Sequence, residues 1–263
     1  MSGPALIFGG NYSNLEATRA LLAEAKRLGI PPGNIVCTGD VIAYCADPLA
    51  TVEVMRRSGV HVLMGTCEQS LGLNSGGCNN SELIAAEWYT FADRMLDDGA
   101  RAWMRMLPRR IDLDIGGRRL AVIHGGVHDI NRCIFASTPA AVKREELGFA
   151  DCDGVLSGHC GLPFTEIVDD RLWHNAGAIG MPANDGTPRT WYSTIVACDD
   201  KLRIERHALA YDFATAARKM SQAGLSDRYA LALQDGLWPN CDALPKAERA
   251  QRGKPLTPGW IEW

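Results

Sequence analysis

Val36-Cys37-Thr38-Gly39-Asp40 is an apolar segment that ends in a glycine and a carboxylate. The pattern is typical of a buried strand that delivers an acidic side chain to the loop after its C-terminal end. Open α/β sheets bind their ligands at this end of their strands, so Asp40 is a candidate ligand-binding residue. A role as a turn residue or helix cap is the alternative, and for an isolated Gly-Asp pair it is the more common one.

Three later segments repeat the arrangement, each a short apolar run that stops at a residue able to bind a metal ion. They are Val62-Leu63-Met64-Gly65-Thr66-Cys67, Ala121-Val122-Ile123-His124 and Val155-Leu156-Ser157-Gly158-His159. Because the carboxyl ends of neighbouring parallel strands meet at one edge of a sheet, these side chains are expected to lie together. Carboxylate and imidazole groups bind transition metals, so the sequence predicts a metal site at this edge.

Strands and helices alternate in the first part of the chain. The hydrophobic pattern predicts strands at 5–8, 35–38 and 60–64 and helices at 15–28 and 48–58. The first helix follows a capping-box pattern, Ser13-Asn14-Leu15-Glu16. This order predicts a partly parallel sheet with helical cover. A loop at 72–81 and a helix at 82–96, with Ser81 as its cap, are expected next.

Hairpins dominate the second half of the chain. The predicted pairs are 111–115 with 118–123, 165–168 with 171–174, and 191–197 with 202–209. These antiparallel pairs favour a second sheet packed on the first, within an α/β domain that spans residues 1–211. Residues 212–263 read as a helical and Pro-rich extension that packs on the body or forms a subunit contact in a homo-oligomer.

Composition excludes several classes of partner. The formal net charge is −4 and the pI is about 5.9, so no basic surface for nucleic acid is expected. No apolar stretch approaches the roughly 20 residues that span a bilayer, so no membrane partner is expected. Nine cysteines without a CxxC pair favour reduced thiols, and with no N-terminal signal pattern we expect a cytoplasmic protein.

Five short elements, in their order along the chain, resemble the calcineurin-like metallophosphoesterase superfamily from about residue 5 to 210. They are Gly39-Asp40, Gly65-Thr66-Cys67-Glu68, His124-Gly125, Gly158-His159 and Asn175-Ala176-Gly177. The resemblance implies a four-layer α/β/β/α sandwich of two stacked mixed sheets flanked by helices. It also implies two metal ions at the strand ends, which clamp a phosphate and activate a water molecule.

The resemblance assigns only half of the family's ligands to residues able to bind a metal. The family's Asp-x-His falls on Gly10 and Tyr12, and the last His of its Gly-His-x-His falls on Gly161. All three losses belong to the first metal position. The second position keeps its ligands, with Thr66 in place of the family's Asn: Asp40, Thr66, His124 and His159. We therefore expect one divalent ion of Fe, Mn or Zn per chain, with two ions as the alternative.

Six further residues are candidates for the same pocket. Cys67 and His174 are candidate catalytic residues that donate a proton to the leaving group. The candidates for substrate binding are Asn11, Cys45, Arg132 and Cys160. A thiol near a metal ionises readily, and an arginine binds phosphate with two hydrogen bonds. The alternatives are inert buried cysteines, structural hydrogen bonds and a solvated arginine.

Three classes of function are compatible with these residues. The first is a metal-dependent phosphoesterase that acts on a small phosphorylated metabolite. The second is a mononuclear iron or zinc enzyme whose site has been adapted to a lyase, non-phosphate hydrolase or oxidation reaction, since fold does not fix chemistry. The third is a non-catalytic metal-binding protein whose aromatic tail contacts a partner.

Overall fold

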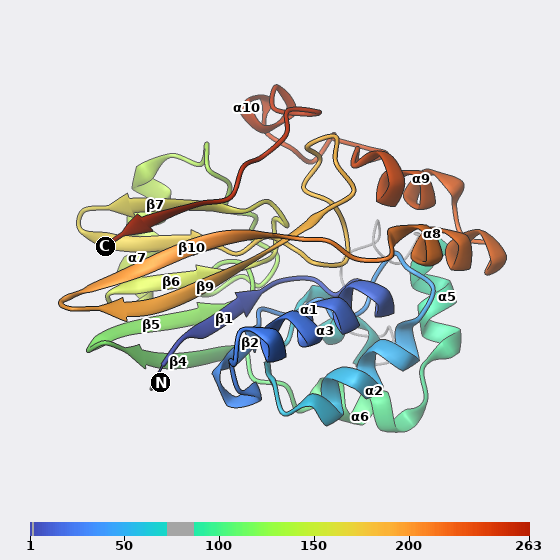
Figure 1. Ribbon diagram of the computed structural model, residues 1–263, viewed down its shortest axis with the longest axis horizontal. Coiled ribbons are helices and arrows are strands. Elements are labelled where there is room, and N and C mark those ends of the chain that lie inside the picture. Colours follow the sequence, from blue (N-terminus) through green and yellow to red (C-terminus); the bar gives the residue numbers. More distant parts are fainter. Residues whose placement is uncertain (2, 73–86) are drawn as a thin grey trace.

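The computed structural model describes residue 1, residues 3–72 and residues 87–263, and two β-sheets stack face to face in it (Figure 1). The first sheet has six strands in the order β11-β10-β9-β1-β2-β3. β1, β2 and β3 are parallel, and β9 joins β1 antiparallel. The bounds are β1 Ala5–Phe8, β2 Ile35–Cys37, β3 His61–Val62, β9 Thr190–Cys198, β10 Lys201–Leu209 and β11 Gly259–Glu262.

The second sheet has five strands in the order β4-β5-β6-β8-β7. Its central strands β5, β6 and β8 are parallel, and the edge strands β4 and β7 are antiparallel to their neighbours. The bounds are β4 Arg110–Ile115, β5 Arg118–Ile123, β6 Gly154–Ser157, β7 Phe164–Val168 and β8 Arg171–Asn175. Both sheets are therefore mixed, as expected.

Helices cover the outer faces of the two sheets. Their bounds are α1 Leu15–Arg27, α2 Pro48–Ser58, α3 Thr66–Gly72, α5 Glu87–Met95, α6 Asp98–Arg105, α7 Ala140–Ala150, α8 Phe213–Gln222, α9 Asp227–Asp235 and α10 Lys246–Arg249, with a 3-10 turn at Pro32–Asn34. The predicted loop at 72–81, its cap Ser81 and the start of the helix at 82–96 lie outside the described residues, apart from Gly72 at the end of α3. Within the described ranges, every helix is too short or too polar to cross a membrane.

Side-chain alternation along the strands separates the layers. Ile7 of β1 packs between the two sheets together with Val122 of β5, whereas the next residue, Phe8, packs on the helical side of the first sheet. In the second sheet, Ile123 faces a different core, which it shares with Leu147 of α7. Because successive strand residues point to opposite faces, the three cores lie between four layers. The predicted α/β/β/α sandwich is confirmed.

The β9–β10 hairpin belongs to the first sheet, and not to the second sheet that we predicted from the antiparallel pattern. β9 pairs with β1 through Ile195 opposite Ala5 and Ser193 opposite Ile7. Hairpin periodicity identifies two adjacent strands but carries no information on the third strand beside them. The tail contains a further unpredicted strand, β11, which pairs along the outer edge of β10.

Two local assignments also differ from the sequence pattern. Asn14, and not Ser13, caps α1, because its side chain accepts a hydrogen bond from the Ala17 N–H at 3.1 Å. The Ser13 hydroxyl instead accepts from the Ala43 N–H at 3.2 Å. α3 begins directly at Thr66, and the sequence analysis did not predict a helix there. The helix is short, and the periodicity signal needs a longer window.

The loops that follow β1 and β2 are bonded to each other along their backbones. The N–H groups of Gly10 and Tyr12 donate to the carbonyls of Gly39 and Asp40, each at 3.1 Å. Tyr12 and Asp40 both adopt left-handed backbone conformations, with φ of 51° and 59°. Such conformations are costly for residues other than glycine and persist where surrounding structure enforces them. This paired loop layer places Asp40 at the edge of the sandwich.

Candidate metal centre

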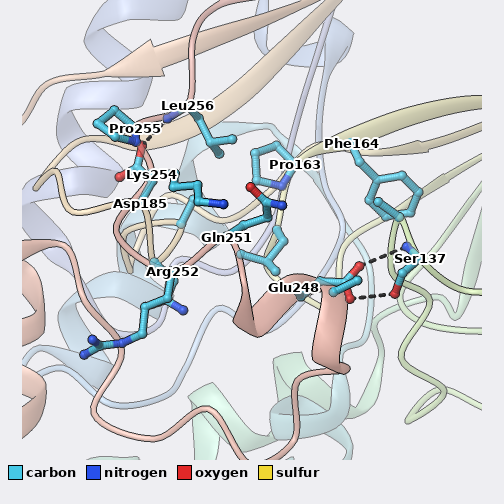
Figure 2. A pocket seen from close by; sticks show the side chains of 15 residues that line it. Ser137, Pro163, Phe164, Asp185, Glu248, Gln251, Arg252, Lys254, Pro255 and Leu256 are labelled. Carbon is cyan, nitrogen blue, oxygen red and sulfur yellow. Dashed lines mark hydrogen bonds between the residues drawn. The ribbon is translucent and has the colours of Figure 1, made fainter.

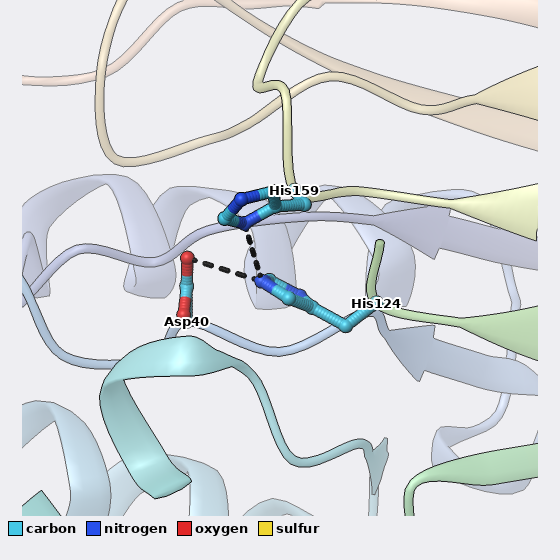
Figure 3. A group of neighbouring side chains, drawn as sticks. All are labelled: Asp40, His124 and His159. Atoms are coloured by element: carbon cyan, nitrogen blue, oxygen red, sulfur yellow. Dashed lines mark hydrogen bonds and ion pairs between the residues drawn. The ribbon is translucent and has the colours of Figure 1, made fainter. Parts of the chain in front are cut away.

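Three loops bring Asp40, His124 and His159 together at the C-terminal ends of β2, β5 and β6 (Figure 3). One ligand atom from each side chain lies within 4.8 Å of the other two. Asp40 and His124 are buried, and His159 is partly exposed. These three residues come from parts of the chain that are far apart in sequence, and the fold gathers them at one point.

The tautomer of His124 follows from its hydrogen bonds. Its Nδ1 lies 2.7 Å from the carbonyl oxygen of Thr38, which only accepts, so Nδ1 carries a proton. In the neutral ring, the Nε2 lone pair then faces Asp40 Oδ2 at 3.3 Å and His159 Nδ1 at 3.0 Å. Electron-rich atoms at these distances repel unless a proton or a cation lies between them. The donor set of two imidazoles and one carboxylate suits a transition metal ion with open coordination positions.

The electrostatics of the cluster couple its three groups. Burial acts to lower the pKa of His124, but the neighbouring Asp40 carboxylate outweighs it and raises this pKa above its usual range. Burial acts to raise the pKa of Asp40, but the neighbouring His124 and His159 outweigh it and lower the pKa below its usual range. Burial and the nearby His124 ring lower the pKa of His159 to about 4. At neutral pH the cluster therefore presents an ionised carboxylate and an uncharged His159 ring, the forms in which both groups bind metals.

Glu68 supports Asp40 from behind and was not singled out in the sequence. Its fully buried carboxylate accepts hydrogen bonds from the N–H groups of Gly65, Asp40 and Ile42 at 2.9, 2.8 and 3.2 Å. Burial and the charge of Asp40 raise the pKa of Glu68 to about 7, while these N–H donors act to lower it. The signal was present, since Glu68 completes the Gly-Thr-Cys-Glu element, but no local pattern shows which backbone groups it meets.

Thr66 and Cys67 begin α3 beside the cluster. The Cys67 N–H donates to Asp40 Oδ1 at 3.0 Å, which fixes the carboxylate through the backbone and not through the thiol. The Thr66 hydroxyl donates to Asn131 Oδ1 at 2.8 Å. Both residues therefore lie at the site that the sequence predicted, while the ligand role of Thr66 and the catalytic role of Cys67 stay predictions.

The remaining candidates lie in different surroundings. Asn11 Nδ2 donates to Thr18 Oγ1 at 2.9 Å, and the thiol of Cys45 lies 3.8 Å from the Gly180 carbonyl. The Cys160 sulfur accepts from Asn175 Nδ2 at 3.2 Å, and burial raises the pKa of its thiol to about 12. These side chains make structural contacts, and their predicted roles in substrate binding stay predictions.

His174 and Arg132 are not part of the metal cluster. His174 lies fully buried in β8, where its Nδ1 is 2.9 Å from Thr165 Oγ1, and burial lowers its pKa to about 3. Arg132 forms an ion pair with the buried Glu146. Its guanidinium charge is therefore already balanced within the protein. The structure does not bring either side chain together with Asp40, His124 and His159, and their roles stay predictions.

A cavity of about 390 Å³ lies between α10, the chain that follows it, and three segments of the body, 136–137, 162–164 and 183–185 (Figure 2). Ser137 and Glu248 meet across it through hydrogen bonds of 2.9 and 2.6 Å. The segment 162–164, shortly after His159, forms part of the wall, but the three clustered ligands do not line it. The cavity therefore adjoins the loop that carries His159 without containing the metal cluster.

Comparison with known proteins fits this geometry. The model of the calcineurin-like phosphoesterase superfamily domain matches residues 12–201. The chain belongs to the calcineurin-like phosphoesterase superfamily. This assignment confirms the resemblance that we identified from the sequence, and it places the chain in a general class of divalent-metal-dependent, phosphoesterase-type hydrolases.

Similar proteins match most of this chain. The uncharacterized protein MJ0912 of Methanocaldococcus jannaschii is 26% identical over 225 residues, which cover 80% of this chain and 88% of that protein. Among solved structures, a metallophosphoesterase from Sphaerobacter thermophilus has a TM-score of 0.72 at 21% identity, and hypothetical protein PH1004 from Pyrococcus horikoshii OT3 has a TM-score of 0.75 at 15% identity. Each alignment covers 89% of this chain and 99% of the other. At these identities the two structures support the fold alone.

Proposed function

We propose that the protein is a metal-dependent phosphoesterase that acts on a small phosphorylated metabolite through a site for one metal ion. The observation that carries this proposal is the convergence of Asp40 Oδ2, His124 Nε2 and His159 Nδ1 at one point, with the His124 lone pair directed inward by the Thr38 carbonyl. Membership of a phosphoesterase superfamily supports the reaction class.

The residues of the cluster have separate tasks in this proposal. Asp40, His124 and His159 would hold the ion, and the Cys67 N–H would keep the Asp40 carboxylate oriented. Glu68 would hold the loop that carries Asp40 in place through its backbone hydrogen bonds. A divalent ion bound in such a site lowers the pKa of a bound water toward ~7 and stabilises negative charge on a phosphate.

A second candidate is a mononuclear iron or zinc enzyme with non-phosphate chemistry. It is favoured by the glycines and tyrosine at the three positions that the resemblance assigns to the first metal, Gly10, Tyr12 and Gly161. A site with one ion lacks half of the clamp that stabilises phosphoryl transfer in two-metal enzymes. Two histidines and one carboxylate with open positions also form the ligand set of non-haem iron enzymes.

Metal analysis combined with turnover separates the two candidates. The full chain is purified without added metal, its metal content is measured by elemental analysis, and hydrolysis of bis(p-nitrophenyl) phosphate is followed after loading with Mn²⁺ or Zn²⁺. The phosphoesterase proposal predicts turnover that depends on the metal and that His124→Ala abolishes together with metal binding. The matched control is His61→Ala, which removes an exposed imidazole on β3.

Two outcomes would contradict the first proposal. One tightly held iron without turnover of any phosphate ester favours the second candidate. Metal binding and turnover that survive His124→Ala would show that the clustered side chains are not the metal site. In that case the reaction takes place at another site, and the metal site proposed for both candidates is wrong.

A further inference from the structure

Tyr12 occupies the space that the resemblance assigns to the first metal ion. Its ring lies directly over Gly10, because a Cβ atom added to Gly10 would lie 2.3 Å from Tyr12 Cζ. At the other end, the Tyr12 hydroxyl oxygen lies 3.4 Å from where a Cβ of Gly161 would be. The three positions that lack the family's first-metal ligands therefore meet in space, and one phenol side chain fills the gap between them. These residues do not fit a second cation.

The protein holds Tyr12 in this place at a cost in backbone conformation. Its φ of 51° is in the left-handed region, which is sterically costly for a bulky residue. The conformation is fixed by the Tyr12 N–H to Asp40 carbonyl bond and by the Cys45 N–H, which donates to the Tyr12 carbonyl, both at 3.1 Å. The ring packs edge-on against Tyr44 at 5.0 Å, and Tyr44 is also left-handed, with φ of 45°. Strain of this kind is concentrated at functional sites.

The hydroxyl of Tyr12 is available to a ligand. The side chain is 8% exposed, and none of the hydrogen bonds formed within residues 3–72 and 87–263 uses its hydroxyl. A tyrosine with its ring buried normally finds a partner for its O–H group. Here the O–H group lies beside the backbone of Gly161, two residues after the ligand His159.

We infer that the Tyr12 hydroxyl takes the place of the first cation and donates a hydrogen bond to a phosphate oxygen of the substrate. This inference rests on the proposed function. It also bears on the charge of the substrate, because a neutral donor replaces a divalent cation. One divalent ion balances Asp40 and, in its ionised form, the buried Glu68 behind it, so the site carries a net charge between 0 and +1, which favours a singly charged phosphodiester over a doubly charged monoester. Arg132 does not change this count, because Glu146 neutralises it.

The test compares wild type with Tyr12→Phe, which removes only the hydroxyl oxygen. Tyr192→Phe is the matched control, since the Tyr192 hydroxyl bonds Glu24 of α1 and is not part of the cluster. Each protein is loaded with Mn²⁺, and bound manganese per chain is counted by elemental analysis. Binding of diphenyl phosphate and phenyl phosphate at pH 7.5 is measured from the paramagnetic broadening of their ³¹P signals, which needs no turnover.

We expect one manganese per chain in all three proteins and tighter binding of diphenyl phosphate than of phenyl phosphate by wild type. Tyr12→Phe should weaken diphenyl phosphate binding about 2- to 12-fold, the range for one hydrogen bond, while Tyr192→Phe matches wild type. Two manganese ions in wild type, or unchanged affinity in Tyr12→Phe, would overturn the role of Tyr12 and leave the proposed function standing. No broadening of either ester by manganese-loaded wild type would overturn both.

Discussion

Gly65→Ala tests whether close packing behind Asp40 shapes the metal centre. An added Cβ at this position would lie 2.3 Å from the Asp40 nitrogen, 2.5 Å from Asp40 Oδ1 and 2.8 Å from Glu68 Oε2. Ordinary contacts of this kind are about 3.4 Å or longer, so Asp40 or its loop must move by roughly 1 Å. The backbone of Gly65 is not left-handed, and the effect of the substitution is therefore steric.

The size of the effect follows from these contacts. Forcing a methyl group into a packed interior costs about 1–3 kcal/mol of unfolding free energy. Displacement of a metal ligand or of its supporting hydrogen bonds weakens metal binding by about 10- to 100-fold. We therefore expect both a lower stability in urea and a higher dissociation constant for Mn²⁺, measured by competition with a chelating dye.

Gly148→Ala is the control for the same chemical change. Gly148 lies in α7, and a Cβ added there has no neighbouring atom within 4 Å. Alanine in a helix interior is favoured over glycine by about 0.5–1 kcal/mol, so this variant should be slightly stabilised and bind Mn²⁺ as wild type does. If Gly65→Ala kept the stability and the Mn²⁺ affinity of wild type within twofold, the packing argument for Asp40 would be refuted.

Two other predictions concern stability away from the metal centre. Burial lowers the pKa of His174 to about 3. Below pH ~6.5 the unfolded chain therefore binds a proton on this ring that the folded chain excludes. The contribution of His174 to the free energy of unfolding is constant above pH ~6.5 and falls by roughly 1.4 kcal/mol for each pH unit below that value. Urea unfolding at pH 7 and 5.5 should show a smaller acid-induced loss for His174→Gln than for wild type, and equal losses would contradict this explanation. Truncation before Gly259 removes β11 and exposes the edge of β10, so the shortened chain should unfold at a lower temperature and aggregate more readily in light scattering, whereas an unchanged melting temperature would show that the strand contributes little.

The meeting of Asp40, His124 and His159 could be predicted from sequence because strand ends carry positional information. An apolar run that stops at Gly39-Asp40, His124 or Gly158-His159 marks the end of a buried strand, and parallel strands in one layer align these ends. The alternating pattern of the first 65 residues likewise predicted the correct strands and helices, because each has its own local periodicity. The positions of the loops that follow these strands can thus be predicted without knowledge of the whole topology.

The sequence analysis did not predict the features that depend on contacts between residues far apart in the sequence. The burial of His174 depends on which face of β8 packs against a neighbouring layer. The pairing of β9 with β1 is fixed only when the whole sheet assembles. Glu68 meets three N–H groups from two loops, and β11 is a short strand that follows a Pro-rich segment without alternation. Local sequence patterns contain no information on these tertiary contacts. Where the contacts and the local propensity favour different structures, the contacts decide.

The backbone bonds between the loops after β1 and β2 have a consequence for how the protein responds to chelators. The loop that presents Asp40 is fastened by Gly10, Tyr12 and Ser13 through chain-to-chain hydrogen bonds of 2.8–3.1 Å, none of which passes through a cation. Withdrawal of the ion would therefore leave this scaffold intact, unlike in zinc fingers, where the metal itself drives folding. A preorganised site of this kind binds an ion without ordering a loop. Little of the coordination energy would therefore be lost to conformational entropy, and nearly all of it would contribute to affinity.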